Sequence, residues 1–194
     1  MAYPVSIQIE PRLQQKDRLT TAFRPILAIP HAILVVSGHN NVGLLSAVAY
    51  FLAIVSWFTI LVTGRQLEGI REFSLYYLRW RTRALAYTGL FVDKYPPFGD
   101  APYPTAIDVE NPPAERDAVS VALRLILALP HFIVLAVLLL AWLLVTIAAW
   151  FVVLFTRDYP ASLYPFASGV MRWMLRVEAY MLLLIDEYPP FALD

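Results

Sequence analysis

The sequence predicts an all-α integral membrane protein with about four transmembrane helices, which come from a tandem two-span repeat, together with interfacial helices and short extra-membrane β-strands. Three observations predict this fold class. Hydrophobic residues make up 59% of the 194 residues and charged residues only 15%, whereas charged residues make up about 25% of an ordinary soluble domain. Mean hydropathy is +0.60. The chain also contains long uncharged segments and repeats its own motifs.

The repetition covers almost the whole chain. Tyr3–Glu10 returns as Tyr103–Glu110, and Ile26–His31 returns as Ile126–His131. Each copy then has an apolar run that ends in Trp-Phe, an Arg-Trp pair and a final Asp-x-Tyr-Pro-Pro-Phe motif. Such repetition indicates two copies of one structural unit. The chain therefore divides into repeat 1 (1–98), a linker (99–102) and repeat 2 (103–194).

Each repeat opens with a predicted β-strand. Val5, Ile7 and Ile9 alternate with polar residues, and Ile107 and Val109 keep the alternation in repeat 2. A period of two is typical of a strand with one buried face. A single strand leaves its backbone groups unpaired, so we expect the two copies to pair with each other outside the bilayer.

A partly polar interfacial helix is predicted next, over residues 17–29 and 115–129. Pro30 and Pro130 follow it, and proline kinks a helix or starts a new one. Residues 132–155 are uncharged and would extend about 36 Å as a helix, which is enough to cross a bilayer core of about 30 Å. The equivalent span in repeat 1 is placed at 44–62, after a polar insert at 37–43 that contains His39 and should lie at a membrane surface.

The second span of each repeat is predicted at 73–92 and 166–185, and both segments contain arginines. These segments either span the membrane or lie in its interface. We favour spans, because four spans return the end of each repeat to the side where that repeat began. Two spans per repeat would relate the halves by a pseudo-two-fold axis along the membrane normal. Residues 1–20 do not resemble a signal peptide, which favours cytoplasmic termini.

Composition excludes several kinds of function. Formal net charge is zero, which argues against nucleic-acid binding. There is no cysteine, so disulfides, thiolate metal sites and cysteine nucleophiles are excluded. The sequence lacks a Gly-rich phosphate loop, a Gly-x-Ser-x-Gly elbow and a His-Glu-x-x-His motif. We therefore predict no enzyme activity and no metal site.

The arginines of the second spans are the main candidate site. Arg79 and Arg83 lie four residues apart, as do Arg172 and Arg176, so each pair shares one helix face. A charge at bilayer depth normally has a partner or a purpose. The arginines could bind lipid headgroups or another anion, pair with acidic groups such as Glu178, or extend to the membrane surface.

Two equivalent histidines, His31 and His131, are weaker candidates. Each follows a proline at the start of a span, and two imidazoles related by a pseudo-two-fold axis could hold a haem or a metal between the halves. The simpler interpretation is a polar residue at the membrane surface. We therefore predict no cofactor, with haem between the two histidines as the alternative.

The repeated motifs resemble a bacterial membrane-protein family known as domain of unknown function 4389. The resemblance rests on Leu-Ala-x-Pro-His, a span that ends in Trp-Phe, Arg-Trp-x-x-Arg and the final Asp-Glu-Tyr-Pro-Pro-Phe of repeat 2. Repeat 1 departs from it by a seven-residue insert and by Lys94 in place of Glu187. The resemblance implies a small integral membrane protein and no known activity. We predict that the chain is a multi-pass protein of the bacterial inner membrane. The Tyr-Pro-Pro-Phe ends are interpreted as interfacial anchors.

From these features we expect a non-catalytic integral membrane protein that acts as a scaffold or accessory subunit. Two units fused in one chain often replace the two chains of a dimer, so self-association or membership of a larger membrane complex is expected. The alternative is a homo-oligomeric pore or a lipid or anion transporter that uses the intramembrane arginines. Membrane lipid is a predicted partner in both cases.

Overall fold

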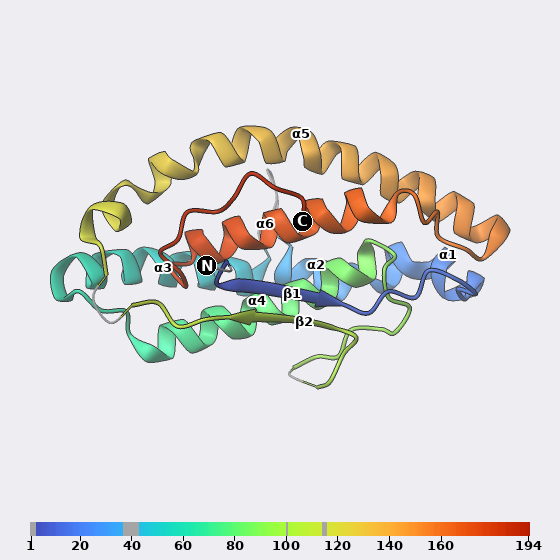
Figure 1. The fold of residues 1–194 in the computed structure, drawn as a ribbon. Helices are drawn as coiled ribbons and strands as arrows, with labels where there is room; N and C mark the ends of the chain where they lie inside the picture. The colour runs from blue at the N-terminus through green and yellow to red at the C-terminus, as the bar shows by residue number, and fades with distance from the viewer. Residues whose placement is uncertain (1–2, 37–42, 100, 114–115) are drawn as a thin grey trace.

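The computed structural model describes residues 3–36, 43–99, 101–113 and 116–194. It is mostly helical with one small sheet, and every element runs along the same long axis (Figure 1). Repeat 1 forms β1 (Val5–Ile9), α1 (Arg18–Leu27), α2 (Ile29–Val35), α3 (Leu44–Thr63) and α4 (Glu68–Thr88). Repeat 2 forms β2 (Thr105–Val109), α5 (Ala118–Thr156) and α6 (Tyr164–Met181).

The two predicted strands exist and pair with each other in antiparallel register. Ile7 faces its own equivalent, Ile107, at the centre of the pair. The backbone N–H of Glu10 donates to the Pro104 carbonyl oxygen at 2.9 Å, and that of Glu110 donates to the Pro4 carbonyl oxygen at 2.9 Å. A pseudo-two-fold axis therefore passes between the strands, perpendicular to the sheet.

The elements stack in three layers. The sheet covers α4 and α6, which lie in the centre. On the far side of α4 and α6 lie α1, α2, α3 and α5, and α5 forms a long arch that packs on α1, α3 and α6 (Figure 1). Most residues of α6 and about half of those of α4 are buried. By contrast, α5 buries a single stripe with the spacing of one helix face.

The two repeats differ where the prolines lie. Pro30 stands in the first turn of α2, where its missing N–H has no helical partner to lose. In repeat 2, however, α5 continues through Pro130 as one helix of 39 residues. The prediction that a new helix starts at Pro130 is therefore wrong, whereas a kink at Pro130 remains a prediction. Most of the polar insert, including His39, and the predicted helix start at Glu115 lie outside the described residues.

Two of the described helices are long and apolar enough to cross a membrane. These are α3 and α5. The sequence predicted α4 and α6 as further spans, but the structure places these two helices at the centre of the molecule. The four-span arrangement remains a prediction.

The C-terminal ends of α3 and α5 are equivalent in the two repeats but have different capping residues. Gly64 ends α3 and Arg157 ends α5, both with left-handed backbone at φ 73° and 67°. This conformation costs a non-glycine residue about 1 kcal/mol or more. Arg157→Gly should therefore raise the free energy of unfolding by about 1 kcal/mol, read as a higher Tm in mild detergent. Arg157→Ala, which keeps the strained backbone, should give no increase, and an equal increase in both variants would contradict this explanation.

Candidate functional site

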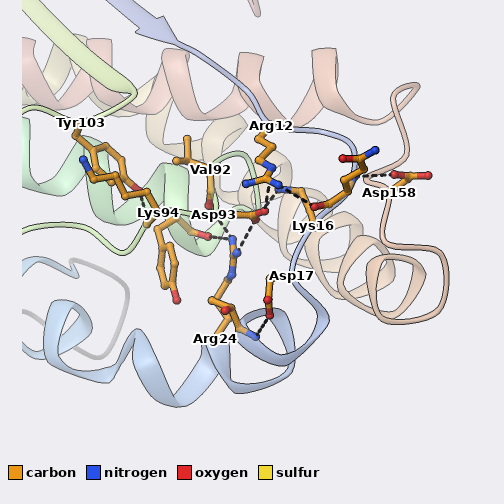
Figure 2. A network of polar contacts seen from close by, with 12 residues as sticks. Arg12, Lys16, Asp17, Arg24, Val92, Asp93, Lys94, Tyr103 and Asp158 are labelled. Atoms are coloured by element: carbon orange, nitrogen blue, oxygen red, sulfur yellow. Dashed lines mark hydrogen bonds and ion pairs between the residues drawn. The ribbon is translucent and has the colours of Figure 1, made fainter.

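A buried charged cluster joins the start of repeat 1 to its end. The side chains of Arg24 and Lys16 converge on Asp93 (Figure 2). Arg24 Nη2 lies 2.9 Å and Lys16 Nζ 3.0 Å from Asp93 Oδ1. Arg24 Nη1 also donates to the carbonyl oxygens of Tyr87 and Val92, at 2.9 and 3.0 Å. Burial lowers the pKa of Lys16, while its hydrogen bond to Asp93 acts in the opposite direction.

Repeat 2 builds the same cluster from equivalent residues. Arg124 Nη2 donates to Asp186 Oδ1 at 2.8 Å, and Arg116, the equivalent of Lys16, places its Nε 2.6 Å from Asp186 Oδ2. Arg124 Nη1 donates to the carbonyl oxygens of Tyr180 and Ile185, both at 2.9 Å. Each arginine also lies over a tyrosine ring, Tyr87 or Tyr180. We call each arrangement an Arg–Asp clamp.

The clamps exist because α4 and α6 end in the same unusual way. Leu90 and Leu183 adopt left-handed backbone, with φ of 66° and 61°, just after the last helical turn. The chain turns there, so the carbonyls of Tyr87 and Tyr180 accept from the N–H groups of Leu90 and Leu183, three residues on, in place of the regular bond from four residues on. The guanidinium of Arg24 or Arg124 binds these carbonyls and the following aspartate together, with the fixed fork that arginine provides. Each clamp therefore caps a helix and fixes the chain that follows it.

Beside each clamp lies a cluster of aromatic rings around a buried histidine. Trp80 Nε1 donates to His31 Nδ1 at 3.0 Å, and the rings of Tyr95 and Phe98 lie 4.9 Å from that of His31. Repeat 2 has the equivalent set, with the same 3.0 Å bond between tryptophan and histidine. Its members are His131, Trp173, Tyr188 and Phe191. The Tyr-Pro-Pro-Phe motif, predicted as an interfacial anchor, thus packs against its own repeat's histidine.

The bond from Trp80 requires an unprotonated Nδ1 and so a neutral His31. Burial lowers the pKa of His31 below its usual 6.5, although the Pro96 carbonyl acts to raise it. The unfolded chain then binds protons more readily, so this contribution to stability is present above about pH 6.5 and is lost as the pH falls. We expect His31→Asn, which keeps an acceptor but does not titrate, to flatten the fall in Tm between pH 7 and pH 5. An unchanged slope would contradict this prediction.

An ion pair between Arg81 and Glu178 joins the two repeats. Arg81 of α4 places Nε 2.5 Å from Glu178 Oε2 of α6, and the hydroxyls of Tyr77 and Tyr50 donate to Glu178 Oε1 at 2.6 and 3.1 Å. Arg81 also donates to the Val35 carbonyl oxygen at 2.6 Å. The pseudo-symmetric position is entirely apolar. Its equivalents of Arg81, Glu178, Tyr77 and Tyr50 are Met174, Leu85, Val170 and Leu143.

The structure separates the arginines that the sequence grouped together. Arg79 is exposed, whereas Arg83 is buried and donates to the Gly99 carbonyl oxygen. Arg172 Nη1 lies 3.4 Å from the hydroxyl oxygen of its helix neighbour Ser168. Arg176 donates to the Asp194 carbonyl oxygen and lies 5.8 Å from the centre of the Tyr3 ring. The acidic candidate Glu178 pairs with Arg81. Lipid or anion binding by these arginines remains a prediction.

The clamp residues themselves were not identified from sequence. Arg24 and Asp93 are 69 positions apart, so no local pattern links them. One signal was available, because the same arginine and the same aspartate occur in both repeats. His31 and His131, the candidate haem ligands, lie in separate aromatic clusters, each bonded to the tryptophan of its own repeat. The described residues contain no group of three or more metal-binding side chains.

Two open apolar grooves run between the repeats at equivalent positions. The first, of about 410 Å³, lies between α1 and α5 beside Trp150, and the second, of about 560 Å³, lies between α3 and α5 beside Trp57. Each tryptophan donates its Nε1 hydrogen to a backbone carbonyl of the other repeat, at Thr21 or Val121. The polar groups of both tryptophans are therefore used within the fold, and the groove walls present hydrocarbon.

Comparison with known protein families gives a match in both repeats. A family model described as "Domain of unknown function (DUF4389)" matches residues 18–99 and 118–192, once in each repeat. No curated protein and no solved structure matches the chain.

Proposed function

The chain belongs to the DUF4389 family, and we propose that it is a non-catalytic, membrane-embedded protein that acts as a scaffold or accessory subunit. The observation that carries this proposal is the reversed distribution of polarity. Arg24, Arg81 and Arg124 are at most 4% exposed, whereas many large apolar side chains of α1, α2, α3 and α5 are more than half exposed. A soluble protein rarely exposes a continuous apolar surface of this extent.

The longest helix illustrates the pattern. The ionisable residues of α5 are Arg124 and His131, and their side chains are buried, at 2% and 0% exposed. The outward positions carry large apolar residues along the whole helix, among them Ile126, Ile133 and Leu140. Hydrocarbon is the solvent in which such a surface is stable. We propose that this membrane is the inner membrane of a bacterium.

The contacts of the buried polar groups support a structural role for these groups, because their partners lie within the protein. The clamp arginines bind helix carbonyls and aspartates, and the carboxylate of Glu178 binds Arg81 and two tyrosine hydroxyls. The alternative function, a pore or a lipid or anion transporter, needs arginines that reach a ligand. Arg83 and Arg176 instead donate to backbone carbonyls, Arg83 to that of Gly99 in the linker and Arg176 to that of Asp194. These contacts favour the scaffold.

Membrane retention tests the proposal. Membranes from cells that express the full chain are washed with alkaline carbonate, which removes peripheral proteins. We expect the protein to stay in the pellet and to be released only by detergent. Release by carbonate or by high salt alone would contradict the proposal.

The particle mass in mild detergent separates the possible roles. A scaffold that self-associates should have a mass that is a multiple of the 22.0 kDa chain, and an accessory subunit should co-purify with a fixed larger complex. A lone monomer in every mild detergent tested would contradict both forms of the proposal.

A further inference from the structure

We propose that the molecule lies flat in a single leaflet, with its helices parallel to the membrane plane, the face formed by α1, α2, α3 and α5 among the acyl chains and the sheet facing water. This inference rests on the proposed membrane location and replaces the four-span topology with a monotopic one. The acyl chains of one leaflet cover the apolar face, so no partner protein is needed to cover it.

The first line of evidence is Lys16, which contacts residues just after α4 and just after α5. Lys16 Nζ bonds to Asp93, just after α4, and the Lys16 backbone N–H donates to the Arg157 carbonyl oxygen at 2.8 Å, just after α5. In the four-span topology, residues 93 and 157 lie on opposite sides of a hydrocarbon core about 30 Å thick. A single residue cannot contact both sides. The C-terminal ends of α4 and α5 therefore meet on the same side of the membrane.

The second line of evidence is the sheet, because the two strands and the residues that flank them together run beside α4 from one end of the helix to the other. The Arg12 backbone N–H donates to the Phe91 carbonyl oxygen at the C-terminal end of α4. Near the N-terminal end of α4, Arg71 donates to the Glu110 carbonyl oxygen at 3.0 Å. About 20 helical residues separate those two places, or about 30 Å. If α4 crossed the bilayer, this two-stranded sheet would have to cross it as well.

A two-stranded sheet cannot lie in hydrocarbon. Each strand has one edge without a partner strand, and unpaired backbone groups in lipid cost several kcal/mol each. The outward side chains of the sheet are also suited to water, because Ser6, Gln8 and Asp108 are exposed. The sheet therefore marks the aqueous side, and the opposite layer marks the lipid side.

The length of α5 agrees with this orientation. Its 39 residues extend about 58 Å, nearly twice the thickness of the hydrocarbon core. A helix that crossed the membrane would carry much of its apolar surface beyond the bilayer. A helix in the membrane plane keeps all of that surface at one depth, and its buried stripe, including Arg124 and His131, turns toward α6 and the sheet.

Single-cysteine labelling tests the inference cleanly, because the chain has no cysteine. Four exposed positions follow the ends of α3, α4, α5 and α6: Arg65, Lys94, Asp158 and Glu187. Each is replaced by cysteine in the full chain and treated with a membrane-impermeant maleimide in spheroplasts and in inverted vesicles. We expect all four to react from the same side. Reaction of Arg65→Cys and Asp158→Cys from one side and of the other two from the opposite side would overturn the proposal.

Ile133→Cys on the apolar face of α5 is the matched control, since Ile133 is 71% exposed in the isolated molecule. It should react only after the membrane is dissolved in SDS, and reaction before that would place this face in water and overturn the proposal. Carbonate-washed membranes are used throughout. Loss of the protein in that wash would reject the membrane location itself, whereas divided labelling of a retained protein would reject only the single-leaflet orientation.

Discussion

Glu178→Leu should be one of the most destabilising substitutions in the molecule, at about 3–5 kcal/mol. It leaves the guanidinium of Arg81, which is 4% exposed, without its carboxylate. Removing one member of a buried ion pair costs far more than removing both, because the remaining charge stays buried and uncompensated. The double variant Arg81→Met/Glu178→Leu should therefore recover most of the loss.

The protein itself supplies the design of that double variant. Met174 and Leu85 occupy the pseudo-symmetric positions, so the fold already accommodates this apolar pair once. Thermal unfolding in mild detergent should rank the double variant close to the wild type and well above either single variant. A double variant as unstable as Glu178→Leu would show that the charge pair itself stabilises the join between the repeats.

Asp186→Asn should have an effect of similar size, with a loss of at least about 3 kcal/mol. Two buried cations, Arg116 and Arg124, share the Asp186 carboxylate, and asparagine keeps its shape but not its charge. We expect a strongly lowered Tm and a faster loss of helical circular dichroism on heating.

The neighbouring Glu187→Gln is the control for that variant. Glu187 is exposed, and surface substitutions of this kind usually change stability by less than about 0.5 kcal/mol. The first repeat offers an independent copy of the experiment, because Asp93→Asn should act like Asp186→Asn. Equal stability of Asp186→Asn and Glu187→Gln would contradict the structural role given to the clamps.

The features that sequence predicted well depend on short-range patterns. The alternation of Val5, Ile7 and Ile9 predicted a strand, and the repetition predicted that this strand pairs with its copy, which the register of Ile7 against Ile107 confirms. The repeated motifs also indicated the family, which the match in each half confirms. Both inferences need only the spacing of residues along the chain.

The features that sequence did not predict depend on contacts between distant residues. The partners in each clamp and in the Arg81–Glu178 pair are more than 60 positions apart, so neither composition nor local periodicity identifies them. Pro130 misled for a related reason. A proline inside a helix removes one hydrogen bond and crowds the preceding turn, but the packing of α5 along α6, α1 and α3 keeps the helix continuous.

The spans were predicted from length and hydropathy, and these two properties do not show how a helix is oriented relative to the membrane plane. A long apolar helix satisfies both criteria whether it crosses a bilayer or lies within it. Only the tertiary contacts, above all those of Lys16 with residues on two helix ends, distinguish the two orientations. In the proposed single-leaflet orientation, the arginines of α4 and α6 lie in the layer beneath the sheet and not at bilayer depth.

The depth of α5 in the bilayer tests the central claim most directly. Nitroxide labels at Ile126, Ile133, Leu140 and Ile147 occupy one exposed face at seven-residue steps over about 32 Å of helix. Their collision rates with oxygen and with a water-soluble nickel complex report depth in reconstituted liposomes. A helix in the membrane plane predicts one common, lipid-buried depth for all four labels. A depth that rises from one surface to the bilayer centre and falls again to the other surface would contradict the account.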